Sequence, residues 1–488
     1  MKLGEVDIAR IEFDLRSRDE IPKMLIGFQH IYTTPGLREE VFKLLENLIP
    51  ERINKNTGRP GMELWQILVM GSLRLNCDWN YDKLQEIVNH HSTIRRMLGV
   101  GTMEDHVKFQ LSTLKDNVSL LTPAILEQIN DMLVKYAHEE IVKKKSSDIK
   151  ASCDSFVAKT NVHYPTDVNL LNDAMRKVLC LVSELCSRKG IGGWRQGKHL
   201  MREIKKELHH VQNVKRKNRK NKDKDRTARR IKSVHRSFIN LCEPILSRVT
   251  ETIAAFGKLK LNKFEQKRMI SLKDFAKDAA RQIDQIRRRV LNGEAIRPTE
   301  KIYSLFERHT EWIVKGKAGV SQELGVKLCI MKDQYGFILN HFVMEKLEDA
   351  DVAVSFTEDT KKKFTNLKTC SYDKGFYSAA NKAALSKILD FVIMPKKGKL
   401  NSSEQESENS QEFKSGRKKH SAVEATISAL QNHGLDLCPD KKITGFKRYI
   451  ALAIFSRNVQ IVGHLIQQQK LREQLRRDRK NQQFRAAA

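Results

Sequence analysis

Apolar runs and paired cysteines are both missing from this sequence. No stretch of about 18 consecutive apolar residues occurs, so no membrane span is expected. The opening MKLGEVDIARIEFD contains no apolar core of a signal peptide. The eight cysteines include no CxxC pair, which argues against a zinc site or a disulfide framework and predicts free or buried thiols. These absences predict a cytoplasmic protein with no membrane partner.

Positive charge is the largest excess in the composition. The 488 residues include 89 Lys and Arg against 59 Asp and Glu, which gives a formal net charge of +30. This excess predicts a polyanionic partner, with nucleic acid first and an anionic membrane surface second. A soluble basic protein without such a partner is the alternative.

The densest basic segment spans residues 202–236, with fifteen Lys or Arg and four Asp or Glu. It lies inside residues 187–300, which the apolar spacing predicts to be almost wholly helical. Few aromatic residues interrupt the segment, so contact with DNA phosphates is favoured over base stacking, and a solvated helical hairpin is the alternative. The candidate phosphate contacts are Lys215, Arg216, Lys217, Arg229 and Arg230.

Residues 1–145 are predicted to be helical. Apolar residues recur at a spacing of three to four over residues 61–76, and two shorter helices are expected over residues 81–100. Helices joined by a tight turn are compatible with a DNA-binding helix-turn-helix, although an ordinary helical bundle is the commoner arrangement. The candidate phosphate contacts here are Arg59, Arg74, Arg95 and Arg96.

Three carboxylates lie in expected strands or in an expected helix. Residues 149–160, IKASCDSFVAKT, alternate in part like a strand and contain Asp154. Residues 367–378 include a second expected strand that ends on Asp373, and residues 417–432 form an expected helix with Glu424 in its first half. A single Asp in a strand is more often salt-bridged or at a sheet edge, because burying an unpaired charge is costly.

The three acids, in this order and setting, resemble the catalytic triad of DDE transposases of bacterial insertion sequences. The resemblance rests on NVHYPTDVNLLNDA after the first acid, SYDKGFYS around the second, and HSAVEATISALQNHGLDLCPDK followed by GFKRYIALAIFSRN around the third. It covers the catalytic half well and the N-terminal part loosely. It implies an RNase H-like domain in which Asp154, Asp373 and Glu424 hold two divalent ions, Mg²⁺ or Mn²⁺.

The same resemblance implies partners and further site residues. The partners are double-stranded DNA, as element ends and as target, and a second copy of the chain in a synaptic homodimer. The compartment is the bacterial cytoplasm, with the protein held at the nucleoid by DNA. Lys374 follows the second acid, and His420 lies one helical turn before the third. Arg457 and Asn458 follow an apolar helical run. All four are candidate phosphate contacts.

The expected fold is α/β, an RNase H-like mixed sheet with a large helical insertion, preceded by an all-α domain. Other expected elements are a strand at 302–306, a hairpin of 326–332 and 336–344, a disordered loop at 401–412 and an apolar helix at 446–466 packed on the sheet. The expected divisions are a DNA-binding domain at 1–145, a catalytic domain at 146–186 and 301–469, a basic insertion at 187–300 and a basic tail at 470–488.

Three functions are compatible with these residues. The first is a transposase that binds the terminal inverted repeats of its element, cleaves a strand and joins it to target DNA. The second is a metal-dependent DNA nuclease without strand transfer. The third is a non-catalytic DNA-binding protein of transposase origin, against which the presence of all three acids argues.

Overall fold

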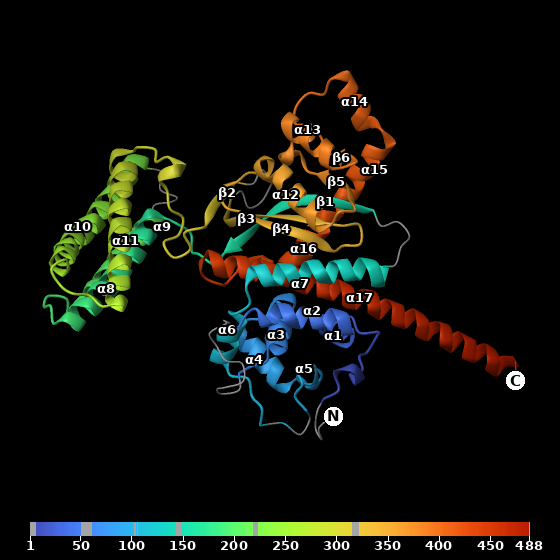
Figure 1. The fold of residues 1–488 in the computed structure, drawn as a ribbon. Coiled ribbons are helices and arrows are strands. Elements are labelled where there is room, and N and C mark those ends of the chain that lie inside the picture. The colour runs from blue at the N-terminus through green and yellow to red at the C-terminus, as the bar shows by residue number, and fades with distance from the viewer. Residues whose placement is uncertain are drawn as a thin grey trace. The chain divides into compact units, whose positions relative to one another are not determined.

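The chain forms two compact units in a computed structural model (Figure 1). Unit 1 comprises Met1–Asn161 and Glu311–Ala488, and unit 2 comprises Val162–Thr310. The structure describes residues 6–49, 61–101, 104, 106–142, 148–217, 223–314 and 322–487. Each unit has its own hydrophobic core.

Unit 1 is organised around a mixed sheet in which seven strands are described. They are β1 (Ile149–Thr160), β2 (Glu311–Val314), β3 (Gln322–Lys332), β4 (Ile338–Met344), β5 (Leu367–Tyr372), β6 (Phe391–Ile393) and β7 (Leu437–Cys438). The order is β2-β3-β1-β5-β6, with β4 also on β3 and β7 also on β1. β1 is therefore central, antiparallel to β3 and parallel to β5. The predicted mixed α/β class and the predicted hairpin are confirmed.

Two local predictions in this half of the chain are wrong. Residues 302–306 form no strand, because the Ser304 hydroxyl accepts the backbone N–H groups of Phe306 and Glu307 and turns the chain. Residues 401–412 are not a disordered loop but contribute to α14 (Ser402–Asn409) and α15 (Gln411–His420). A capping box between Asn401 and Glu404 starts α14, and the Glu404 carboxylate lies 2.6 Å from the Lys396 ammonium.

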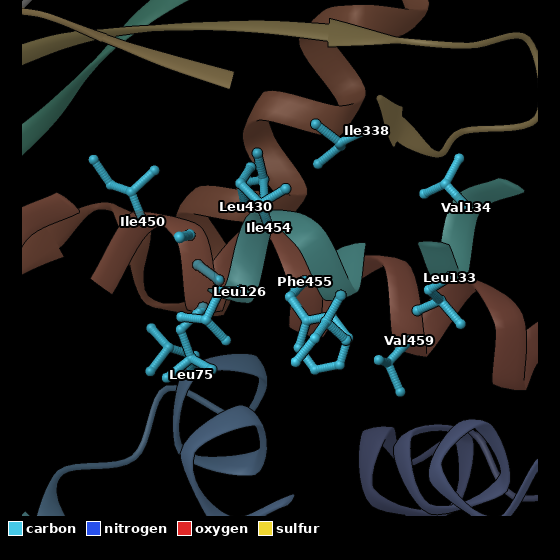
Figure 2. Close-up of a cluster of buried hydrophobic side chains, with 14 of the residues drawn as sticks. Leu75, Leu126, Leu133, Val134, Ile338, Leu430, Ile450, Ile454, Phe455 and Val459 are labelled. Carbon is cyan, nitrogen blue, oxygen red and sulfur yellow. The ribbon is translucent and has the colours of Figure 1, made fainter. Parts of the chain in front are cut away.

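The N-terminal helices belong to the same compact unit as the sheet. They are α1 (Glu20–Thr33), α2 (Pro35–Glu46), α3 (Leu64–Asn76), α4 (Tyr81–His90), α5 (Ser92–Met97), α6 (Leu111–Val118) and α7 (Pro123–Tyr136). Helices α1, α3 and α7 pack on the long helix α17 (Lys442–Ala487), and α7 and α17 also contact β4. Figure 2 shows this shared core, in which Leu75 of α3, Leu126 of α7 and Ile454 of α17 lie together.

Helix α17 is the central helix of unit 1. By length and composition its Lys442–Arg479 part could cross a membrane, but 72% of the apolar window is buried inside the protein. This burial is typical of a core helix. The predicted apolar helix at 446–466 is confirmed, and it packs on α1, α3 and α7 as well as on the sheet. The basic tail continues the same helix, with its side chains mostly exposed after Gln467.

Unit 2 is built mainly from four helices, as the sequence predicts. They are α8 (Asp167–Lys189), α9 (Gly197–Lys217), α10 (Lys224–Phe256) and α11 (Lys263–Ile286). The unit begins at Val162 rather than at 187, because the apolar stripe of α8 packs against α9 and α11. The helix was expected to belong to the catalytic domain, and its packing places it in the insertion.

Candidate active site

Asp154 lies in the middle of the central strand, on the face opposite to the core. Side chains alternate along a strand, so Asp154 shares its face with Lys150 and Ser152. Their neighbours Ala151 and Cys153 point the other way and are buried in the core. Asp154 is half-buried, and its Oδ1 accepts the backbone N–H of Ser155 at 2.7 Å.

Asp373 follows β5 directly and reaches the same place from the neighbouring strand. In the parallel register of β1 and β5, Cys153 pairs with Tyr372. The next residues along the two strands are Asp154 and Asp373, so the register brings the two acids side by side. Asp373 is exposed and is the N-cap residue of the short helix η5 (Lys374–Phe376).

Glu424 comes from a helix over this edge of the sheet. The predicted helix at 417–432 is divided at Ser421 into α15 and α16 (Ala422–Leu430). Glu424 lies in the first turn of α16 and is exposed, whereas Val423 and Leu430 of the same helix are buried. Figure 2 shows Leu430 within the apolar cluster near Ile454. The buried side chains anchor the helix that carries Glu424.

The charges of the nearby acids act on Asp154. Burial, together with the negative charges of Asp373, Asp349 and Glu424, raises the pKa of Asp154 to about 6. The hydrogen bond from the Ser155 N–H opposes this rise. Asp154 therefore lies within electrostatic range of Asp373 and Glu424, and Asp349 adds a further negative charge.

Asp349 was not among the site residues predicted from the sequence. It is the first residue of α12 (Asp349–Lys363), and its Oδ1 accepts the Ser155 hydroxyl at 2.6 Å. Its carboxylate also lies against Gly375, where an added Cβ would be 2.7 Å from Oδ2. The signal was the acidic run EDAD directly after a predicted strand, which is typical of a helix N-terminus.

His420 and Lys374 lie beside the acids, as expected. The His420 Nδ1 is 3.0 Å from the Ser371 hydroxyl oxygen. Burial lowers the pKa of His420, and the charges of Asp373 and Glu424 oppose that shift. Lys374 is exposed directly after Asp373. His420 is therefore within range of the charges of two of the acids, and Lys374 adjoins Asp373 in sequence.

Asn458 and Arg457 are not part of this cluster, so that prediction is wrong. Asn458 is fully buried, and its amide donates to Asn130 Oδ1 at 2.6 Å and to the Ile338 carbonyl at 2.9 Å. Its Oδ1 also accepts the Ile338 N–H at 2.9 Å. The Arg457 guanidinium donates to Gln460, and burial lowers its pKa. Asn458 therefore connects α17 to α7 and to β4, whereas Arg457 forms a hydrogen bond within α17.

Two of the N-terminal arginines are also excluded as phosphate contacts by their burial. Arg74 is 4% exposed, with its guanidinium 4.0 Å above the Tyr81 ring and 3.5 Å from an Asp440 oxygen. Arg95 is 7% exposed and donates to backbone carbonyl groups, including that of Glu104 at 2.8 Å. Arg96 is half-buried, and Arg59 lies outside the described residues.

The basic candidates of unit 2 are mostly open to solvent. Arg216, Lys217, Arg229 and Arg230 are exposed, on α9 and α10. Lys215 is half-buried, and burial followed by the charge of Arg289 lowers its pKa. Four of the five cations are therefore accessible to a polyanion.

Hard cations such as Mg²⁺ prefer carboxylate oxygens, and a cluster of mutually repelling carboxylates suits them chemically. Within the described ranges, no three His, Cys, Asp or Glu side chains are grouped closely enough to hold a metal ion. No protein-family model, curated protein or solved structure matches this chain. The chemistry of the site must therefore be argued from its own residues.

Proposed function

We propose that this chain is a DNA transposase with an RNase H-like catalytic domain. It would bind the terminal inverted repeats of its element, cleave a DNA strand with divalent metal, and join the freed end to target DNA. The proposal is carried by one observation: the strand register sets Asp373 beside Asp154, and the charges of Asp373 and Glu424 both act on Asp154. Its compartment would be the bacterial cytoplasm, at the nucleoid.

The positions of the acids in the fold support this proposal. The resemblance places the first acid on the central strand, the second at the end of an adjacent strand and the third on a helix. Asp154 is on central β1, Asp373 follows adjacent β5 and Glu424 is on α16. Three acids that are 219 and 51 residues apart in sequence would not come within electrostatic range of one another by local preference alone.

The side chains have separable roles in this chemistry. Asp154, Asp373 and Glu424 would hold Mg²⁺ or Mn²⁺, which supplies charge neutralisation and activates the attacking oxygen when bound. The Ser155 N–H fixes one oxygen of Asp154. Burial lowers the pKa of His420. The Ser371 hydroxyl donates to Ser152 Oγ, so its oxygen can accept the Nδ1–H of His420, which would orient the imidazole near the acids.

Charge distribution supports double-stranded DNA as the partner. The net charge of +30 favours a polyanion, and the exposed cations of α9 and α10 can neutralise phosphates without reading bases. Joining two element ends requires both to be held at once, so the active complex would contain a homodimer.

The decisive experiment is a cleavage and joining assay on labelled DNA carrying the repeats that flank the coding region. Wild type would be compared with Glu424→Gln, in Mg²⁺ and in Mn²⁺. Glu406→Gln is the matched control, because Glu406 is an exposed glutamate of α14 away from the acids. We expect nicked and joined products with wild type and with the control, and neither product with Glu424→Gln.

Other outcomes would select a different function. Cleavage without joining would indicate a nuclease. Binding of the ends with neither cleavage nor joining, in either metal, would indicate a DNA-binding protein whose acids record only ancestry.

A further inference from the structure

A pocket lies on the same sheet face as Asp154, two residues back along β1. The register pairs Ser152 with Lys332 of β3 and with Ser371 of β5. Directly paired residues on neighbouring strands point to the same side, so these side chains share the face of Lys150 and Asp154. Two residues of a strand span about 7 Å. The pocket therefore begins within a few ångströms of the acid cluster.

Helix α15 covers this face without filling it. Gly416 of α15 lies so close to Ile393 of β6 that any added Cβ would collide with the isoleucine side chain. Beside this close contact remains a cavity of about 330 Å³, whose lining includes the apolar side chains of Phe391 and Ile393 and several polar side chains. A small ligand with an apolar part and a polar part fits such a lining.

The polar side of the cavity is cationic. Lys150, Lys332 and Lys419 line it, and none of them forms an ion pair with a described residue. Its two acids are Glu412, which is exposed, and Asp333.

The carboxylate oxygens of Asp333 already have hydrogen-bond partners inside the protein. Its Oδ2 lies 2.6 Å from His138 Nε2, and its Oδ1 accepts the backbone N–H groups of Tyr335 and Phe337, each at 2.8 Å. Lys332 is only 9% exposed, so its ammonium is poorly hydrated. The charge of Asp333 favours the Lys332 cation, but burial has the larger effect and lowers its pKa. An anionic ligand would offset the cost of that burial.

A hydrogen-bonded chain leads from the cavity to His420. The Ser371 hydroxyl donates to Ser152 Oγ at 2.9 Å and lies 3.0 Å from His420 Nδ1. The charges of Asp373 and Glu424 act on that histidine, and so does the charge of Lys332. The cavity and the acid cluster are therefore neighbouring parts of one surface. A nucleic-acid strand rises about 3.4 Å per nucleotide, so the distance of about 7 Å between Ser152 and Asp154 corresponds to about two nucleotides.

We propose that this cavity binds one nucleotide of the DNA strand, next to the phosphate that the acids act on, an inference that rests on the proposed function. The phosphate lies against Lys332, Lys150 and Lys419, and the base leaves the stack to pack on Phe391. Base–aromatic packing tolerates any base, because every base has a π face. The cavity thus holds the strand in register with the acids.

Nucleotide binding can be tested without cleavage. Thymidine 5′-monophosphate and inorganic phosphate would each be titrated into the full chain without divalent metal, and binding followed by ³¹P NMR of the ligand. Wild type is expected to bind the nucleotide more tightly than phosphate. Lys332→Met and Lys419→Gln should each weaken nucleotide binding about tenfold, because each loses a charge-assisted contact. Lys387→Met, an exposed lysine on α13 (Ala379–Ile388), should leave binding unchanged.

A further variant distinguishes contact with the base from contact with the phosphate. Phe391→Leu should weaken the nucleotide and not inorganic phosphate. Lys332→Met should also raise the melting temperature, since it removes a buried unpaired charge, so lost binding would not reflect lost folding. Wild-type affinity in both lysine variants, or no binding by wild type, would overturn the proposal. Glu424→Gln should bind the nucleotide normally, so failure of the cavity and failure of the proposed catalysis remain distinguishable.

Discussion

At the scale of single residues, Asp154 is held where its own charge is unfavourable. Burial and the charges of Asp373, Asp349 and Glu424 all raise its pKa, to about 6. Above that pH the folded state carries the repulsion between these acids. A divalent cation would remove the repulsion and bind only the folded protein, so it should stabilise the fold.

We therefore expect Mg²⁺ or Mn²⁺ to raise the melting temperature of wild type at pH 8. The gain is about 2.7 kcal/mol at a metal concentration about 100 times the Kd. Asp154→Asn should melt at a higher temperature without metal and respond little to metal. Differential scanning fluorimetry with calcium as a comparison ion would measure both. Equal metal shifts in wild type and in the variant would place the ion elsewhere.

His235 in unit 2 gives a pH prediction. It is fully buried in α10, its Nδ1 lies 2.7 Å from the Ile231 carbonyl oxygen, and burial lowers its pKa to about 4. The folded pKa is below the unfolded value of 6.5, so the stabilisation is complete above pH 6.5. It is lost as the pH falls from 6.5 towards 4, by an amount on the order of 1–3 kcal/mol.

We expect unit 2 to lose stability over this pH range and His235→Leu to flatten the dependence. Trp194 is the tryptophan of residues 162–310, so 5-fluorotryptophan labelling with ¹⁹F NMR reports on this unit, and Trp194→Phe assigns its signal. Urea titrations at pH 7 and pH 5 would be compared. A variant that loses as much stability as wild type would assign the effect to other groups.

The strand and helix positions of the acids could be predicted from sequence, whereas the burial of several cations could not, for a physical reason. Asp154 and Asp373 are placed by the strand register, which the local pattern of their own segments already suggests. Arg74 looks equally exposed in sequence, but its partner Asp440 is 366 residues away. Asn458 likewise satisfies the backbone of Ile338 across the core. Long-range partners of this kind leave no local signal.

At the scale of elements, the crossing of α1 and α17 depends on two glycines. An added Cβ at Gly463 would collide with the Lys23 carbonyl oxygen, and one at Gly27 would collide with the Val459 carbonyl oxygen. The obstacles are backbone atoms, which cannot move without shifting a helix. The close approach of these helices therefore requires residues without a side chain.

Gly463→Ala should destabilise unit 1 by about 1–3 kcal/mol or more, because overpacking forces the two helices apart. Gly36→Ala is the matched control, since no atom lies within 4 Å of its Cβ position and its φ is ordinary. Chemical unfolding followed by circular dichroism would measure both. A control that is as unstable as Gly463→Ala would show that helix separation is not the cause.

Elements with a strong internal pattern could be predicted, and elements that depend on distant contacts could not. Strand β1 and the hairpin of β3 and β4 match their alternating residues. Helix α14 was missed because its composition is that of a solvated loop, and it is held by the Asn401 cap and by Lys396. The position of α17 between the N-terminal helices and the sheet follows from packing that no local periodicity encodes.

At the scale of the whole molecule, the insertion has its own core and carries much of the positive charge. The boundary at Val162 could not be read from sequence, because the stripe of α8 looks the same whether it packs on a sheet or on α11. The exposed cations of α9 and α10 have no apolar surface to cover and few acids to pair with. They are therefore accessible to an external polyanion, as the proposed function requires.

If these cations contact DNA phosphates, removing them must change how strongly DNA binding depends on salt concentration. Each phosphate contact contributes about −0.9 to the slope of log K against log salt concentration. Arg229→Gln with Arg230→Gln should therefore make the slope less negative by about 2 and weaken all duplex sequences equally. Fluorescence anisotropy with a labelled duplex, over a series of salt concentrations, gives the slope.

The matched control removes the same charge from another helix of the same unit. Lys273→Gln with Lys277→Gln changes two exposed lysines of α11, which were not expected to contact DNA. This pair should leave the slope nearly unchanged, because only cations in contact with phosphates release counterions. Equal changes in both double variants would mean that unit 2 acts through its overall charge. No change in either would remove α10 from the DNA interface and leave the phosphate contacts to unit 1.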